Sequence, residues 1–229
     1  MRILAIDTSC GAASVAVYDG ATRETLARES LPMSQGHAEA LAPTVDRLMR
    51  EVDGGFPSIG RVAVGIGPGS FTGIRIGLAM ARAIALTLEV PVVGISTLVA
   101  FVGPLLEHPQ PGVIASAVDA RHGHVYFQLF ESKGRPILAP RLASLRDAVR
   151  QIGGGPARIV GNAAALLAEE SQRAGVEVDA SEAAAFPDIV ALARIGLAAD
   201  PEAWPARPLY VKAPDAHPST GDAVARIEG

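Results

Sequence analysis

A repeat of the opening pattern constrains the fold more than any other feature of this sequence. The run from Arg2 to Asp7 is apolar and ends in Asp, and a turn, a glycine and a second apolar run follow it. Shifted by 112 positions, Asp7 falls on Asp119 and Gly11 on Gly123. The further matches are Ala5-Ile6 on Ala117-Val118, Val15 on Phe127, Val17 on Leu129, Tyr18 on Phe130 and Asp19 on Glu131. This indicates an internal duplication, although shared hairpin chemistry or chance is an alternative explanation.

The first half also contains an α/β unit. A strand at Arg61 to Ile66, a glycine-rich turn, a helix over Phe71 to Leu88 and a strand at Pro91 to Ile95 predict a right-handed crossover. Two hairpins that each carry an Asp at the end of the first strand suggest the fold of actin, sugar kinases and heat-shock ATPases. We therefore predict an α/β protein with duplicated actin-like, ribonuclease H-like lobes, whose mixed sheets are flanked by helices and whose second lobe is degenerate.

A Pro-rich stretch at 107–112 marks the predicted boundary between the lobes. We assign 1–106 to the first lobe and 107–229 to a smaller second lobe. The second lobe is expected to contain strands at 136–142 and 158–161 and helices at 144–152, 162–174 and 188–199. Its tail from Asp200 is rich in Pro and Ala, and we expect its end, after residue 213, to be mobile.

Composition narrows the classes of function. The formal net charge of −4 disfavours a protein that holds a nucleic-acid backbone on its own. A single cysteine, Cys10, excludes an internal disulfide and a structural thiolate cluster for zinc. From the sequence we expect no apolar run long enough to span a bilayer, and the N-terminus lacks the features of a signal peptide. We therefore expect a cytoplasmic protein without a membrane partner.

The block Gly65 to Gly77, between a buried strand and a long helix, is a candidate anion site, since exposed N–H groups and the helix dipole can hold phosphate there. It matches neither a Walker loop nor a dinucleotide fingerprint. The candidate nucleotide or anion site, vestigial in our interpretation, comprises Asp7, Thr8, Ser9, Gly67, Gly69, Ser70 and Asp119.

Structural explanations compete with that site. Gly67 and Gly69 would supply positive φ around Pro68, Ser70 would cap the helix, and each Asp would cap its own turn. The second turn, with Arg121 and His122, places bulky cations where a nucleotide would need space.

Two helices carry apolar faces. Leu41, Val45 and Leu48 share one face of a helix predicted over 37–52, and the helix over 71–88 alternates small with large apolar residues. Such a helix is buried on two sides, either within the chain or against another protein. Sequence alone does not separate the two.

No metal or hydrolytic site is indicated. His37 has no second histidine one helical turn away, so we expect no metal. Cys10 has no neighbouring cation in sequence to activate its thiol. Ser70 does not lie in a nucleophile elbow.

The chain resembles the TsaB family, whose members belong to the machinery of tRNA threonylcarbamoyladenosine synthesis. The segments that carry the resemblance are Ile3 to Ser9, His37-Ala38-Glu39, Gly65 to Gly77, Val93 to Leu98, Asp119-Ala120-Arg121, Val160 to Ala163 and Tyr210-Val211-Lys212. The glycine block is the most specific of these, and the second lobe agrees less well.

The resemblance implies a non-catalytic, dimerising scaffold. Its partners would be a TsaD-like catalytic subunit and a TsaE-like ATPase, and tRNA would be bound only through the complex. The catalytic paralogue carries a His-x-x-x-His metal pair, where this chain has His37 and then Leu41. The predicted partner interface is Leu41, Val45, Leu48, Ile76, Met80 and Ile84, a surface that could also form a homodimer.

The resemblance implies no resident cofactor, and ATP or ADP would bind weakly, at the complex interface. An active actin-like phosphotransferase or nucleotide-binding protein is the alternative function, motivated by Asp7, Asp119 and the glycine turn. A protease has no nucleophile or metal in this sequence to support it.

Overall fold

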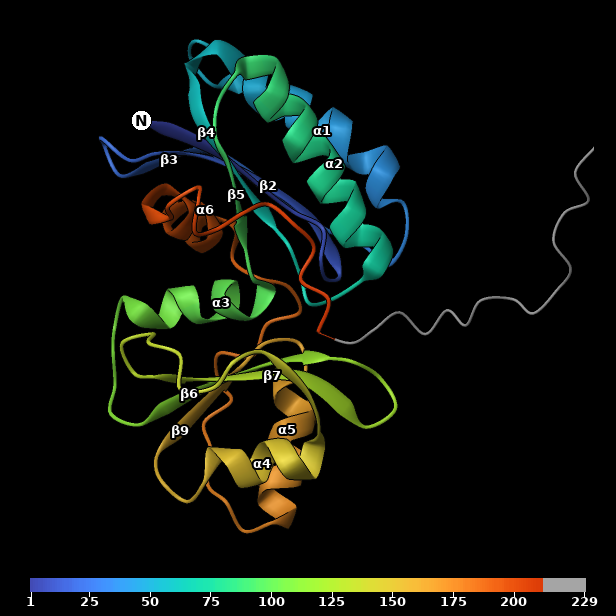
Figure 1. The fold of residues 1–229 in the computed structure, drawn as a ribbon, viewed down its shortest axis with the longest axis vertical. Helices are drawn as coiled ribbons and strands as arrows, with labels where there is room; N and C mark the ends of the chain where they lie inside the picture. Colours follow the sequence, from blue (N-terminus) through green and yellow to red (C-terminus); the bar gives the residue numbers. More distant parts are fainter. Residues whose placement is uncertain (212–229) are drawn as a thin grey trace, which may run out of the picture.

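Two β-sheets organise the computed structural model, which describes residues 1–211 (Figure 1). The first sheet has the order β3-β2-β1-β4-β5, and the second has the order β8-β7-β6-β9. The strands of the first sheet are β1 (Arg2–Asp7), β2 (Ala12–Asp19), β3 (Glu24–Pro32), β4 (Ile59–Gly65) and β5 (Val92–Ile95). Those of the second are β6 (Val113–Asp119), β7 (His124–Glu131), β8 (Arg141–Ser144) and β9 (Ala157–Val160).

The two sheets repeat one topology. In each, an antiparallel hairpin, β1–β2 or β6–β7, is extended by a strand that lies parallel to its first member, β4 or β9. The second strands of the hairpins, β2 and β7, begin and end at positions that correspond after the shift of 112 residues. The duplicated α/β architecture with mixed sheets is therefore confirmed.

Helices cover both sheets and separate them. They are α1 (His37–Glu51), α2 (Phe71–Leu88), α3 (Thr97–Val102), α4 (Leu145–Ile152), α5 (Ala164–Arg173) and α6 (Ile189–Ala198), with 3₁₀ turns at Phe56–Ser58 and Gly103–Leu106. Helices α1 and α2 cover the outer face of the first sheet, and α4 and α5 cover the second (Figure 1). Between the sheets lie α6, which packs on the first, and α3, which contacts β6.

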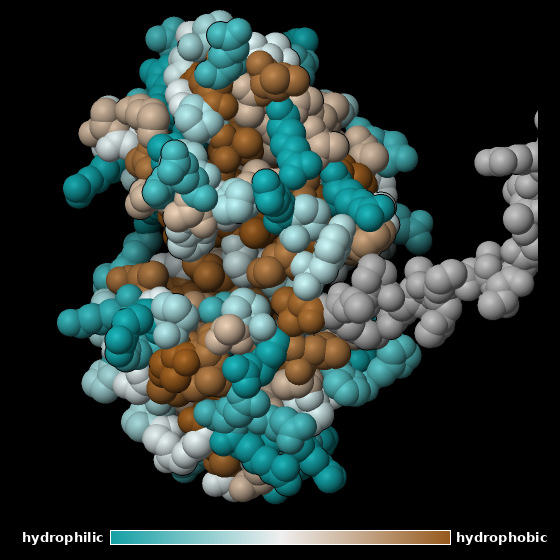
Figure 2. All heavy atoms as spheres, in the orientation of Figure 1, coloured by the Kyte–Doolittle hydropathy of each residue, from teal (hydrophilic) through white to brown (hydrophobic). Residues whose placement is uncertain are grey.

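The middle layer is a continuous apolar contact between the lobes. One cluster joins Leu98 and Phe101 of α3 to residues of the second sheet. Its second-sheet members are Ile114, Val118, Phe130 and Val160. Apolar residues also show at the waist of the molecule in the space-filling view (Figure 2). The space between the lobes is thus filled by side chains at this level.

The last helix corrects the predicted lobe boundaries. Helix α6 packs on β1, β2 and β4 of the first sheet, although it lies in the segment 107–229 assigned to the second lobe. The following residues also return, because the Gly94 N–H donates to the Trp204 carbonyl at 2.9 Å. The second unit of the fold therefore occupies the middle of the chain, and the first combines both ends of the described region. The end of the tail, after residue 213, lies outside the described residues.

Arg61 holds the C-terminus of α6 against the first sheet. Its Nη1 donates to the carbonyls of Gly196, Leu197 and Ala199, at 3.0, 2.9 and 2.8 Å. The last carbonyls of a helix have no partner within the helix, and a cation there is also favoured by the helix dipole. One β4 side chain thus closes the end of a helix that lies far away in sequence.

Replacing this cation should loosen α6. We expect Arg61→Met, which keeps the apolar stem, to lower the free energy of unfolding by about 1–3 kcal/mol, the cost of lost charge-assisted hydrogen bonds. Urea titration followed by circular dichroism measures this. Arg50→Met is the matched control, since Arg50 makes only an exposed ion pair with Asp46. Equal midpoints for the two variants would contradict the capping role.

Candidate functional site

The turn that follows β1 is enclosed by other parts of the first lobe. Thr8 and Ser9 are buried. The Thr8 hydroxyl donates to the Gly73 carbonyl at 2.6 Å, and the Ser9 carbonyl accepts from the Ser70 N–H at 2.8 Å. The Ser9 hydroxyl accepts from the Thr97 hydroxyl at 2.9 Å. The Thr8 hydroxyl and the Ser9 carbonyl are therefore bonded to the start of α2, and the Ser9 hydroxyl is bonded to the start of α3.

Glycines make this enclosure sterically feasible. A Cβ added at Gly69 would lie 2.1 Å from the Ser9 carbonyl oxygen, and one at Gly73 would lie 1.9 Å from that of Thr8. At Gly77 it would lie 2.6 Å from Thr8 Oγ1. Each distance is far shorter than a van der Waals contact. The glycine block therefore serves the close approach of α2 to the first turn.

The structural explanations of this block are mostly confirmed. Gly67 has φ of +92°, follows the predicted pattern, and accepts from the Thr97 N–H at 2.8 Å. Ser70 caps α2 by accepting from the Gly73 N–H at 3.2 Å. The expected positive φ of Gly69 is wrong, because Gly69 is not among the residues with positive φ. Its lack of a side chain is required by the neighbouring Ser9 carbonyl instead.

Asp7 is buried at the end of β1 rather than open to a ligand. Its side chain is 1% exposed and accepts from the Ser9 N–H at 3.3 Å. Gly65 on the adjacent strand leaves room for it, since a Cβ there would lie 1.8 Å from Asp7 Oδ1. Burial raises the pKa of Asp7 to about 6, and hydrogen bonds from Ser9 and Thr8 partly offset this.

Asp119 has a different environment in the second lobe. It is exposed, and its Oδ1 accepts from the Arg121 N–H at 2.8 Å, so it caps its own turn. Arg121 and His122 both have positive φ. The Asp119 N–H donates to Asn162 Oδ1 at 2.8 Å. The structural explanation of Asp119 is confirmed, and no hydrogen bond joins it to the first turn within residues 1–211.

Sequence reasoning gave no role to two residues that complete this region. Thr97 links the first turn to α3, and Asn162 links both lobes, because its Nδ2 lies 3.9 Å from Cys10 Sγ. In the sequence, Thr97 and Asn162 are part of the segments that resemble the TsaB family, and no other pattern marks them. Their partners are distant in sequence, so no local pattern indicates these contacts.

Cys10 and His37 form no reactive pair. Cys10 is buried in the apolar cluster between the lobes, and burial raises the pKa of its thiol to about 12. His37 Nε2 lies 3.3 Å from the Cys10 carbonyl oxygen, not from its sulfur. A thiol with such a pKa stays protonated at neutral pH and is a poor nucleophile. No cluster of three His, Cys, Asp or Glu residues suited to a metal lies within the part of the chain that the structure describes.

The predicted interface residues divide into two groups. Leu41, Val45 and Leu48 are buried in the core under α1, with at most 4% exposure, so they do not lie on a surface that a partner could contact. Periodicity identified the apolar face of α1 correctly but assigned it to the wrong neighbour. Ile76, Met80 and Ile84 are only half-buried and pack at the edge of this core, so their role at an interface stays a prediction.

Helix α2 also corrects the expectation about apolar length. It spans 18 residues with a mean hydropathy of 1.4, which is long and apolar enough to cross a membrane by these criteria alone. One such helix is weak grounds for a membrane span, because a core helix can meet the same criteria. The inner face of α2 packs on β4 and β1, and only 33% of its 18 residues are buried. Much apolar helix surface is therefore left uncovered.

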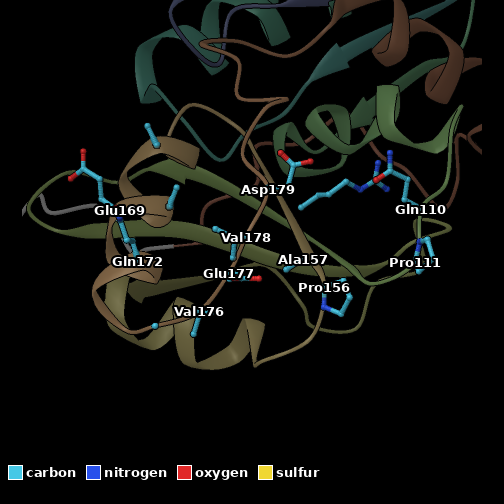
Figure 3. A pocket seen from close by; sticks show the side chains of 14 residues that line it. Gln110, Pro111, Pro156, Ala157, Glu169, Gln172, Val176, Glu177, Val178 and Asp179 are labelled. Carbon is cyan, nitrogen blue, oxygen red and sulfur yellow. The ribbon is translucent and has the colours of Figure 1, made fainter.

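A large, open cavity lies away from the predicted site. It has a volume of about 1040 Å³ and opens in the second lobe beside β9 and α5 (Figure 3). Figure 3 shows Glu169 and Gln172 along one side and Gln110 and Pro111 on the other. None of the residues predicted for the nucleotide or anion site lines it. The cavity thus gives no support to a nucleotide site between the lobes.

Two lobes of one topology and an enclosed first turn define the class of protein: a two-lobed, actin-like α/β protein whose first turn is bonded to its own helices. Comparison with known proteins then identifies the family. The family model described as "TsaD: tRNA N6-adenosine threonylcarbamoyltransferase" matches residues 31–189. The TsaB protein of Haemophilus influenzae is 30% identical over 76% of this chain and 77% of its own length. The chain belongs to the TsaB family.

Two further comparisons agree. The tRNA threonylcarbamoyladenosine biosynthesis protein TsaB of Escherichia coli is 36% identical over 57% of this chain, and the match spans 55% of that protein. A solved structure of YeaZ from Pseudomonas aeruginosa has a TM-score of 0.71 at 24% identity, covering 92% of this chain and all of that one. At this identity the structural likeness establishes the fold alone.

Asp7 offers a direct test of a carboxyl that is buried without a ligand. Its pKa is about 6 in the folded chain and near 3.8 when unfolded, so its contribution to stability is complete below pH 4 and is lost as the pH rises through 6. We expect Asp7→Asn to raise the free energy of unfolding at pH 7.5 by up to about 3 kcal/mol. Denaturant titrations between pH 4 and 8 measure the difference.

The low-pH measurement is the internal control. At pH 4 the wild-type carboxyl is protonated, so the advantage of Asp7→Asn should disappear there. A variant that is less stable than the wild type throughout this range would show that the charged carboxylate makes favourable contacts.

Proposed function

We propose that this chain is the non-catalytic scaffold subunit of the complex that adds threonylcarbamoyl to N6 of adenosine 37 in tRNAs reading A-starting codons. The observation that carries the proposal is the first turn, whose Thr8 and Ser9 are bonded to the chain's own α2 and α3. Membership of the TsaB family supplies the reaction. Its relatives carry the name tRNA threonylcarbamoyladenosine biosynthesis protein.

The proposed partners are a TsaD-like catalytic subunit and a TsaE-like ATPase, in the cytoplasm. The formal net charge of −4 supports tRNA contact through the complex rather than by this chain alone. A catalytic role would need the helical metal pair of the paralogue. Here Leu41, at the position of the second histidine, is fully buried in the core.

The proposed interface is the uncovered side of α2. Ile76, Met80 and Ile84 form its half-buried flank, and Ala79 and Ala83 are exposed beside them. Small residues allow two helix backbones to approach closely. The same surface supports a homodimer when the partner is absent. We place weak ADP or ATP binding, if it occurs in the complex, at this interface.

A charge on that side of α2 should prevent association. Ala83 is exposed, so Ala83→Arg leaves the core intact but places an unpaired cation within the interface. We expect a loss of about 2 kcal/mol or more in binding, roughly thirtyfold in affinity. Binding is measured by co-purification with the TsaD-like protein from the same cell, and the affinity by titration of that protein.

Leu166→Arg is the matched control, because Leu166 is an exposed leucine on α5 of the other lobe. It should bind like the wild type. If the wild-type chain fails to co-purify with a TsaD-like protein that the cell expresses, the scaffold proposal is wrong.

An active phosphotransferase is the second candidate, favoured by the actin-like topology and by Asp7 at the end of β1. It requires a free first turn. We expect calorimetry of the isolated chain with ATP and magnesium to give no heat of tight binding. Micromolar affinity for ATP would favour the phosphotransferase over the scaffold.

A further inference from the structure

Residues 200–211, which follow α6, form a single segment, the strap. It crosses the outer edge of β5 and ends beside the glycine turn that precedes α2 (Figure 1). Along the edge, Val93 bridges Pro205 and the Gly94 N–H donates to the Trp204 carbonyl at 2.9 Å. Nearer its end, the Leu209 N–H donates to the Ile66 carbonyl at 2.8 Å. The strap therefore covers an edge strand that would otherwise be open.

Both charged side chains of α2 reach to the strap. Arg82 donates from Nε and Nη2 to the Ala206 carbonyl, at 3.1 and 2.5 Å. Arg75 lies over the Phe71 ring, 3.8 Å from its centroid, and its Nε donates to the Tyr210 hydroxyl at 3.3 Å. The rings of Phe71 and Tyr210 are 5.5 Å apart. The helix has no other charged residue.

These contacts decide where the charges of α2 lie. Arg75 and Arg82 are each within one helical turn of Ala79, on the uncovered side of the helix. With the strap in place both guanidinium groups are held on one flank. Without it they would be free to cover the exposed small residues, and a partner would have to desolvate them.

The strap buries little apolar surface against the body of the protein. Ala206 is its one buried hydrophobic residue, and Trp204 is only partly buried. Its three prolines limit the number of backbone hydrogen bonds that it can donate. Segments with little buried apolar surface open at a lower free energy than the core does.

We propose that the strap is a clasp whose closure prepares α2 for its protein partner, which makes Arg75, Arg82 and Tyr210 positioning residues for the complex. The proposal rests on the proposed function. A partner that prefers the closed strap must also favour closure by the same factor, because coupling between two equilibria is reciprocal. The strap therefore links the C-terminal part of the described chain to the partner surface.

Trp204 reports directly on the strap, because it is the only tryptophan of the chain. Two variants open the strap from different ends. Tyr210→Ala removes the contact with Arg75. Gly94→Ala changes no residue of α2, but its Cβ would lie 2.6 Å from Ile66 Cγ2 and 2.7 Å from the Pro205 carbonyl oxygen. The Ile66 side chain can shift, whereas the Pro205 backbone, and with it the strap, must be displaced. Glu202→Ala, an exposed change within the strap, is the matched control.

We expect both opening variants to increase acrylamide quenching of Trp204 fluorescence, with far-ultraviolet circular dichroism unchanged. Their affinity for the TsaD-like protein should fall by at least about fivefold. Glu202→Ala should behave as the wild type in both measurements. Adding the partner to the wild-type chain should reduce the quenching.

The outcomes separate the two proposals. Increased quenching with unchanged affinity would overturn the coupling and leave the scaffold function standing. Unchanged quenching in both opening variants would overturn the clasp itself. If the wild-type chain does not bind the TsaD-like protein, the proposed function is wrong. The proposed coupling between the strap and the partner is then wrong as well.

Discussion

The close approach of α2 to the turn after β1 is the contact on which the first lobe depends. It requires backbone against backbone, because Gly69 and Gly73 lie where any side chain would overlap the carbonyls of Ser9 and Thr8. The approach brings the Thr8 hydroxyl to the first turn of α2 and fixes the direction in which the helix leaves the sheet. The position of α2, and hence of its uncovered side, follows from this one packing requirement.

The same contact occupies hydrogen-bonding groups of the turn and of the start of α2. In an actin-like enzyme the turns of both lobes present hydrogen-bond donors to phosphate, whereas here the Thr8 hydroxyl donates to the Gly73 carbonyl and the Ser70 N–H donates to the Ser9 carbonyl. The second lobe repeats the topology, but the contacts of its corresponding turn are different. There Gly161 lies against the Ala117 carbonyl, and Asn162 bonds to Asp119. The duplication thus preserved the fold while the two turns diverged.

Most of the helices and strands could be predicted from the sequence, because the spacing of apolar residues and the Gly and Pro residues at turns are local properties of the chain. The helix over 71–88 was predicted to the residue, since Ser70 caps it and no proline interrupts it. The placement of α6 could not be predicted. Its apolar residues suit either sheet, and the contacts that hold it, such as those from Arg61, join residues more than a hundred positions apart.

The candidate site shows the same limit. Asp7, Thr8, Ser9 and Ser70 were correctly identified as belonging to one region, because strand ends and helix starts meet at one edge of a sheet. Their chemistry was not predictable, since it depends on whether their polar groups face a ligand or each other. The face of α1 was assigned incorrectly for a related reason. A periodic apolar face indicates that Leu41 is buried. It does not distinguish burial in the chain's own core from burial against a partner.

The middle layer connects these observations to function. Enzymes with two lobes around a nucleotide depend on a cleft that opens and closes. Here α3 contacts β6 of the second sheet and α6, which packs on the first sheet, and Cys10 from the first turn belongs to the same apolar cluster as Phe130 of the second lobe. Opening the lobes would expose that cluster to water, which costs free energy. The middle layer therefore opposes relative motion of the two lobes, and this rigidity supports the proposed role in which α2 is held toward a partner.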